Sequence, residues 1–367
     1  MTSRPALRLK RQSGETLTGP GLTESLMWVG GYHLAQTFAG ILLLVLLILV
    51  ACNGLPDQWS DIGVLAAQLG QSELDWLLTA LIGCATLGSL FFVLPMAFWR
   101  MQPHPRDRLG LQLPTIRQIV LLAGAVVPLG ILSDELYRAS SSLMDELLHI
   151  AVSQWPALAA FEFSDDAISL IQGQTSMTAY PQLLVIVGVG PAIGEEVIFR
   201  GLIGHGLTAR WGVVRGVLMT SLLFAIAHIS PSHALATIPI GIFLHVTYIA
   251  TGSLWAPIIV HFLNNALSVT LMKYDLGQNV EVSTLLLVSS AVYVTVIAIL
   301  LARDDGLLEG AFRLRLASRR LRSPLPVSSN IARRFPMTPN WLLLVACTGV
   351  ICFTLSFVAA AMAEPPL

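Results

Sequence analysis

The stretch that decides the fold is PQLLVIVGVGPAIGEEVIFRGLIGHGL, residues 181–207, in which two adjacent glutamates stand inside a long run of apolar residues, Gly and Pro. Glu195 and Glu196 are followed by Arg200, four residues after the second glutamate. A carboxylate at membrane depth is costly, so it persists mainly where it has a partner or faces a wet cavity. This segment therefore predicts a membrane-spanning helix that carries a polar site.

The composition of the whole chain indicates a membrane protein. Of its 367 residues, 54% are hydrophobic and 12% are charged, whereas soluble domains usually carry about 25% charged residues. We expect an all-α, polytopic transmembrane helical bundle that is embedded in a lipid bilayer and has no attached soluble domain. No nucleic acid is needed as a partner to explain the arginines.

Apolar stretches of about 20 residues predict helical spans, and nine are expected here. They are Met27–Ala51, Trp76–Phe98, Ile119–Ser133, Pro181–Leu207, Val213–Ile229, Ala236–Ala250, Leu254–Met272, Thr284–Ala302 and Trp341–Ala363. Segments 119–133 and 236–250 are short, so each is either a tilted span or a partly buried segment. Ser142–Trp155 has apolar residues at helical spacing between charged ones, which predicts an amphipathic segment along the external interface.

The charges of the loops predict the orientation of the chain. Residues 1–26, 100–117 and 303–340 are rich in arginine, whereas residues 58–75 and 134–180 are acidic. Cytoplasmic loops of membrane proteins are enriched in Lys and Arg. We therefore expect a multi-pass protein of the cell membrane with a cytoplasmic N-terminus and an external C-terminus.

The spacing of the two glutamates and the arginine predicts different tasks for the two carboxylates. Residues four apart share a helix face, so Glu196 and Arg200 are placed to form an ion pair. Glu195 is turned about 100° away and is left as a free carboxylate. A free carboxylate that is partly removed from water can act as a general base. A purely structural Glu–Arg lock is the alternative interpretation.

Two further spans carry polar residues at a spacing of four. Phe224 and His228 share a face in the sequence FAIAH, and His261 and Asn265 share a face in HFLNN. A histidine and an amide on one face can donate hydrogen bonds to a developing oxyanion. Polar contacts between helices, which are common in membranes, would explain the same residues without catalysis.

These three motifs resemble the pattern EExxxR, FxxxH and HxxxN of the CPBP (CAAX protease and bacteriocin-processing) intramembrane proteases, which include the type II prenyl-protein endopeptidases. The motifs stand here as EEVIFR at residues 195–200, FAIAH at 224–228 and HFLNN at 261–265. The resemblance covers about a quarter of the chain, from Pro181 to Met272.

The resemblance implies an all-helical intramembrane endopeptidase whose substrate is a membrane-associated peptide or protein. It implies that Glu195 and His228 activate a water molecule and that His261 and Asn265 stabilise the oxyanion. Glu196, Arg200 and Phe224 would support the site.

We therefore expect four regions in the chain. They are a basic cytoplasmic tail (1–26), an N-terminal transmembrane region (27–180) that includes the amphipathic segment, a CPBP-like catalytic core (181–272), and C-terminal spans (273–367) with an arginine-rich loop at 303–340.

Other functions remain as alternatives. One Glu and two His can ligate zinc in principle, which would make the protein a zinc-dependent membrane protease that uses the same residues. We favour a mechanism with no metal cofactor, because it gives His261 and Asn265 a task that a zinc site would not require. The non-enzymatic alternatives are a transporter, for which polar residues would line a pathway, and a peptide-binding membrane scaffold.

Overall fold

The structure is a computed structural model that describes residues 19–51, 64, 70–102, 105–156, 178–228, 230–276 and 282–304. Every element in these residues is helical. The α-helices are α1 (Leu22–Ala51), α3 (Gln71–Gly83), α4 (Ser89–Arg100), α5 (Pro105–Leu109), α6 (Ile116–Gln154), α8 (Tyr180–Leu183), α9 (Gly190–Glu196), α10 (His205–Trp211), α11 (Val213–Ile226), α12 (Pro231–Thr251), α13 (Trp255–Lys273) and α14 (Thr284–Asp304). Three π-helical stretches join some of them: η1 (Cys84–Gly88), η3 (Leu184–Val189) and η4 (Val197–Gly204).

The helical segments are long enough for a multi-pass membrane protein. Among the described residues, 7 helices have the length and apolar composition to cross a membrane, and Val213–Ile226 is apolar but shorter. The prediction of an all-helical polytopic bundle is therefore confirmed for this part of the chain. The expected span Trp341–Ala363, the tail 1–18 and most of the arginine-rich loop lie outside the described residues.

Two predicted spans, 119–133 and 236–250, are shorter than the helices that contain them in the structure. The helix that contains residues 119–133 is α6, which runs for 39 residues from a capping box, where the Thr115 hydroxyl accepts from the Gln118 N–H, to Gln154. Hydropathy alone ended it at the charged residues, but Arg138 pairs with Asp134 at 2.7 Å and with Glu135 at 3.1 Å on the same helix. The residues of the expected amphipathic segment up to Gln154 therefore continue α6 and do not form a separate element.

The segment around residues 236–250 is also longer than predicted. It is α12, which has 21 residues, begins at Pro231 and is followed by Gly252 in the left-handed conformation (φ 61°). Proline is favoured in the first turn because its missing N–H would be unpaired there anyway, and glycine reaches positive φ without steric cost. These end signals, and not hydropathy, mark the limits of the helix.

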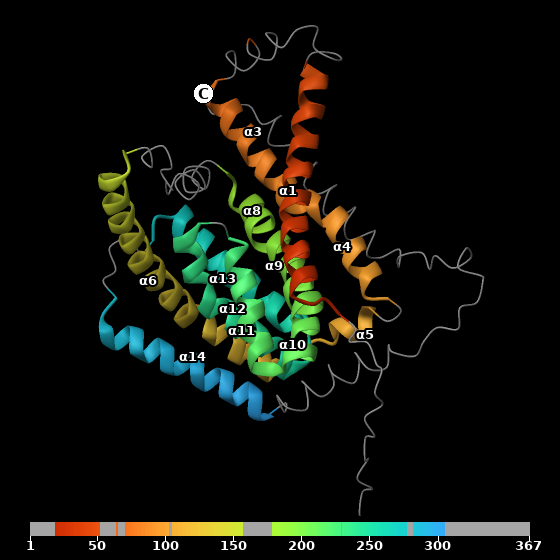
Figure 1. Ribbon diagram of the computed structural model, residues 1–367, viewed down its shortest axis with the longest axis vertical. Coiled ribbons are helices and arrows are strands. Elements are labelled where there is room, and N and C mark those ends of the chain that lie inside the picture. Colours follow the sequence, from red (N-terminus) through yellow and green to blue (C-terminus); the bar gives the residue numbers. More distant parts are fainter. Residues whose placement is uncertain are drawn as a thin grey trace, which may run out of the picture.

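The helices form a central group with two flanks. Figure 1 shows α9, α11, α12 and α13 in the middle, with α1, α3 and α4 on one side and α6 and α14 on the other. One apolar cluster joins α6, α12, α13 and α14, and includes Leu122, Leu244 and Val260. A second joins α1, α4, η4, α10 and α11, and includes Tyr32 and Phe224. The central group is therefore packed on both flanks.

Residues 180–211 form one continuous helical rod of 32 residues that contains both glutamates. Its middle section, α9, is a short α-helix with π-helical turns before and after it. Such π-turns are uncommon and occur frequently at functional sites, because they redirect side chains within a helix. Pro191 lies in the first turn of α9. The rod is therefore irregular on both sides of the carboxylates.

Close approach of helix backbones holds α10 against α11. A Cβ atom added at Gly216 would lie 2.5 Å from Thr208 Oγ1 and 2.6 Å from Thr208 Cα. Lipid tails are as apolar as leucine, so membrane helices associate largely through close packing, for which small residues are required.

We predict that Gly216→Ala lowers the stability by about 1–3 kcal/mol, the usual cost of overpacking a tight contact. Gly30→Ala on α1 is the matched control, because a Cβ there would have no atom within 4 Å. Thermal unfolding of the purified variants in detergent measures both. Equal melting temperatures for the two variants would show that the α10–α11 contact is looser than described.

Candidate active site

The centre of the site is a fully buried ion pair. Arg200 Nη1 donates to Glu196 Oε1 at 2.6 Å, and both side chains have 0% exposure. Arg200 Nη2 also donates to the backbone carbonyl of Gly241 on α12 at 3.2 Å. The Arg200 guanidinium lies 4.4 Å above the centre of the Phe224 ring, which places a cation over an aromatic face. The ion pair expected from the spacing of four residues is therefore present, and Arg200 also connects the rod to α11 and α12.

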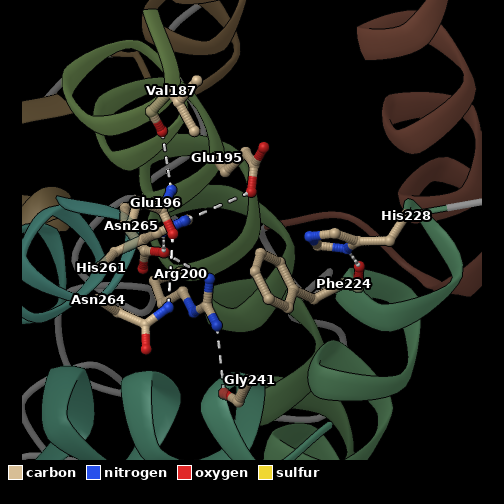
Figure 2. Close-up of polar contacts among 10 residues, drawn as sticks. All are labelled: Val187, Glu195, Glu196, Arg200, Phe224, His228, Gly241, His261, Asn264 and Asn265. Atoms are coloured by element: carbon tan, nitrogen blue, oxygen red, sulfur yellow. Dashed lines mark hydrogen bonds and ion pairs between the residues drawn. The ribbon is translucent and has the colours of Figure 1, made fainter. Parts of the chain in front are cut away.

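The same carboxylate oxygen holds a histidine from another helix. His261 Nδ1 lies 2.8 Å from Glu196 Oε1, and because an ionised carboxylate only accepts hydrogen bonds, Nδ1 must be the donor. Figure 2 shows the Glu196 carboxylate between Arg200 and His261. This bond orients the imidazole and leaves its other nitrogen, Nε2, directed away from Glu196. The spacing of residues along the chain contains no sign of this contact, because it joins α9 and α13 across the bundle.

Glu195 is the carboxylate that remains available. Its side chain is 15% exposed whereas that of Glu196 is 0% exposed. Glu195 Oε2 lies 3.9 Å from His261 Nε2 and has no hydrogen-bond partner among the described residues. The two adjacent glutamates therefore meet opposite nitrogens of a single imidazole, one through a hydrogen bond and one across a gap.

Pro191 explains where the amide of Asn265 lies. A proline has no N–H to donate to the carbonyl four residues earlier, and that residue is Val187. Asn265 Nδ2 donates to the Val187 carbonyl at 2.9 Å. Asn264 Nδ2 lies 3.5 Å from Asn265 Oδ1 and helps to fix the direction of the amide. An amide group carries two N–H donors, so the second donor of Asn265 is not used by Val187.

His228 lies on the other side of the Phe224 ring. Its Nδ1 donates to the Phe224 carbonyl at 2.9 Å, because a carbonyl only accepts, and this leaves Nε2 free. The His228 ring is 4.9 Å from the Phe224 ring and 4.7 Å from the ring of His233. Figure 2 shows the imidazole turned toward the side on which Glu195 and His261 lie. No hydrogen bond joins His228 to Glu195 in the described residues, so a water molecule would have to connect them.

The structure thus brings six predicted residues into one connected set. Glu195, Glu196, Arg200, Phe224 and His261 are joined by direct contacts, Asn265 is attached to the same rod through the Val187 carbonyl, and His228 borders them through Phe224. Motif spacing could not identify the carbonyls of Val187 and Gly241, which belong to the site through backbone atoms only. Pro191 is the sequence feature that could have indicated Val187, because a proline has no N–H to bond to the carbonyl four residues earlier.

The possible metal ligands do not converge. Within the described part of the chain, no group of three or more His, Cys, Asp or Glu is arranged to hold a metal ion. His261 Nδ1 is engaged by Glu196, and its Nε2 is 3.9 Å from Glu195 Oε2.

Comparison with known proteins identifies the same region. Residues 178–267 match the family model described as type II CAAX prenyl endopeptidase Rce1-like. Over 101 residues the chain is 28% identical to a protein of Bacillus subtilis (strain 168) named "Putative membrane peptidase YdiL". That match covers 28% of this chain and 41% of the relative, so the chain spans about two fifths of the length of the curated relative that it matches. No solved structure matches the chain.

We predict that Arg200→Met lowers the stability by about 3–5 kcal/mol, because it leaves the buried Glu196 carboxylate without its cation. The matched control is Arg138→Met, which removes an exposed ion pair with Asp134 and is expected to cost about 0–1 kcal/mol. Unfolding of both variants in the same detergent gives the comparison. An Arg200→Met protein as stable as Arg138→Met would mean that Glu196 is not held as a buried charge.

Proposed function

We propose that this chain, which belongs through residues 178–267 to the CPBP family of membrane proteases, is an intramembrane endopeptidase that hydrolyses a peptide bond of a membrane-associated peptide or protein. The observation that carries the proposal is the unequal environment of two adjacent carboxylates. Glu196 is fully buried and its Oε1 is bonded to both Arg200 and His261, whereas the Glu195 side chain is 15% exposed and comes no closer to His261 than 3.9 Å. A partly exposed carboxylate on a membrane-spanning rod is typical of a functional site.

In this proposal Glu195 is the general base. A water molecule beside Glu195 gives a proton to the carboxylate as its oxygen attacks the carbonyl carbon of the substrate. His228 assists by accepting a hydrogen bond from the same water through Nε2, which is free because Nδ1 donates to Phe224. The protonated Glu195 then returns the proton to the leaving amide nitrogen, so the enzyme ends the cycle in its starting state.

His261 and Asn265 stabilise the negative charge that develops on the carbonyl oxygen. The bond from Nδ1 to Glu196 aims His261 Nε2 toward Glu195 and the reacting atoms. In this task Nε2 must carry a proton, so His261 acts as an imidazolium whose charge is balanced by the neighbouring glutamates. Asn265 contributes the N–H that Val187 does not use. Preorganised donors of this kind contribute about 2.7–4 kcal/mol each when they face an oxyanion.

Glu196, Arg200 and Phe224 position the reacting groups and do not touch the substrate. With His261 protonated, two carboxylates and two cations make an electrically neutral cluster, which lowers the cost of keeping charge at membrane depth. The loop charges support a cytoplasmic N-terminus and an external C-terminus. The family description names a prenyl endopeptidase, which supports a substrate anchored at the membrane.

We predict that Glu195→Gln leaves the protein folded and lowers cleavage by about 10²–10⁴-fold, the usual contribution of a general base. Glu135→Gln on α6 is the control, because that carboxylate is exposed and pairs with Arg138. Proteomics of new peptide termini in membranes with wild-type, Glu195→Gln and Glu135→Gln proteins identifies substrate and bond together. Termini that persist with Glu195→Gln would contradict the proposal.

The same preparations separate the alternatives. Cleavage by the metal-free mechanism is unchanged by a chelator, whereas loss of cleavage that added Zn²⁺ restores would favour the zinc enzyme. Substrate-coupled flux in proteoliposomes without any cleavage would favour a transporter. Peptide binding that survives substitution of Glu195, His228, His261 and Asn265 together, again without cleavage, would favour a scaffold.

A further inference from the structure

A tyrosine from α1 lies beside the catalytic rod. Tyr32 is 3% exposed and packs in the same apolar cluster as Ile198, Phe199 and Phe224. A Cβ atom added at Gly194 would lie 3.5 Å from the Tyr32 hydroxyl oxygen. The hydroxyl thus lies against Gly194, the residue that immediately precedes Glu195.

Two buried polar atoms in this place lack partners. Neither the Tyr32 hydroxyl nor Glu195 Oε2 has a hydrogen-bond partner among the described residues. A buried polar group without a partner is costly, and such groups are usually satisfied by protein or by ordered water. Two unsatisfied groups on facing helices are the arrangement that a bridging water molecule would satisfy.

The position of α1 is set by contacts away from the site. Arg100 of α4 donates to both oxygens of Glu24 at 2.6 and 3.0 Å. Two parallel bonds of this kind fix geometry as well as distance. Gly194 has no side chain, which leaves room for Leu90 and Tyr32 to approach the rod. Tyr32 is therefore held beside the glutamate by the fold of a helix that lies outside the matched residues 178–267.

We propose that Tyr32 is a positioning residue that holds the nucleophilic water beside Glu195. The Tyr32 hydroxyl donates to the oxygen of this water, which leaves the two hydrogens of the water for Glu195 and His228 Nε2 and its second lone pair for the substrate carbonyl. This inference rests on the proposed function, because it assigns a task in that hydrolysis.

The test compares two buried tyrosines, each changed to phenylalanine. Tyr248 is 1% exposed and its hydroxyl donates to the Arg108 carbonyl at 2.9 Å, away from the glutamates. The probe is a quenched fluorescent peptide that spans the bond found by terminus proteomics. We expect Tyr32→Phe to lower kcat about tenfold, the effect of one lost hydrogen bond, with KM and Tm unchanged. We expect Tyr248→Phe to lower Tm and leave kcat unchanged.

Each result supports or overturns the inference. An unchanged kcat in Tyr32→Phe overturns it, as does a fall in Tm like that of Tyr248→Phe, which would show a structural hydroxyl. A higher KM at constant kcat also overturns it, because Tyr32 would then contact the substrate. Glu195→Gln is measured beside them: cleavage that persists in that variant refutes the proposed function itself, whereas its loss together with full activity of Tyr32→Phe refutes only the role of Tyr32.

Discussion

One carboxylate oxygen, Glu196 Oε1, accepts hydrogen bonds from both Arg200 and His261, and the arrangement of the site depends on it. The first bond lies within the rod and the second crosses to α13, so a single buried atom sets the rotation of one helix relative to the other. In a bilayer, apolar surfaces gain little by meeting each other instead of lipid, and polar contacts therefore have more influence on which faces meet. The cost of breaking a buried pair, about 3–5 kcal/mol, far exceeds that of an exposed pair.

Because the two glutamates are adjacent in the sequence, their carboxylates meet different partners. Consecutive residues on a helix point in directions about 100° apart, so a carboxylate next to Glu196 cannot reach Arg200 in the same way. It lies instead beside the other nitrogen of His261, at 3.9 Å. One glutamate is bonded to the imidazole, and its neighbour makes no hydrogen bond to it. Without Glu196, His261 Nδ1 would lose the acceptor that orients its ring.

An irregular stretch of backbone in the rod provides the acceptor that holds Asn265. Pro191 cannot donate to the Val187 carbonyl, and Asn265 uses that carbonyl to fix its amide. The π-helical turns before and after α9 belong to the same irregular stretch. Without the proline, an N–H at position 191 could bond to the Val187 carbonyl, and Asn265 would lose this acceptor. The glycines and the proline make this stretch irregular, and the irregularity determines where the Asn265 side chain of α13 is bound.

Periodicity was sufficient to predict contacts within one helix but not contacts between helices. The spacing of four residues indicated the Glu196–Arg200 pair, and the sequence motifs selected the residues that the structure gathers. The bond from His261 to Glu196, the carbonyl of Gly241 and the position of Tyr32 depend on how distant segments pack, which a single sequence does not show. The limits of α6 were missed for another reason: hydropathy does not detect a helix that continues through charged residues paired along its own surface, as Asp134 and Arg138 are.

The two neighbouring carboxylates, Glu195 and Glu196, are expected to have different tasks. The measurement that tests this expectation is a side-by-side comparison of Glu195→Gln and Glu196→Gln, with melting temperature and peptide cleavage determined on the same purified samples. We expect Glu195→Gln to melt like the wild type and to lose cleavage, and Glu196→Gln to melt at a lower temperature. A stable Glu196→Gln protein beside a destabilised but active Glu195→Gln protein would contradict the account.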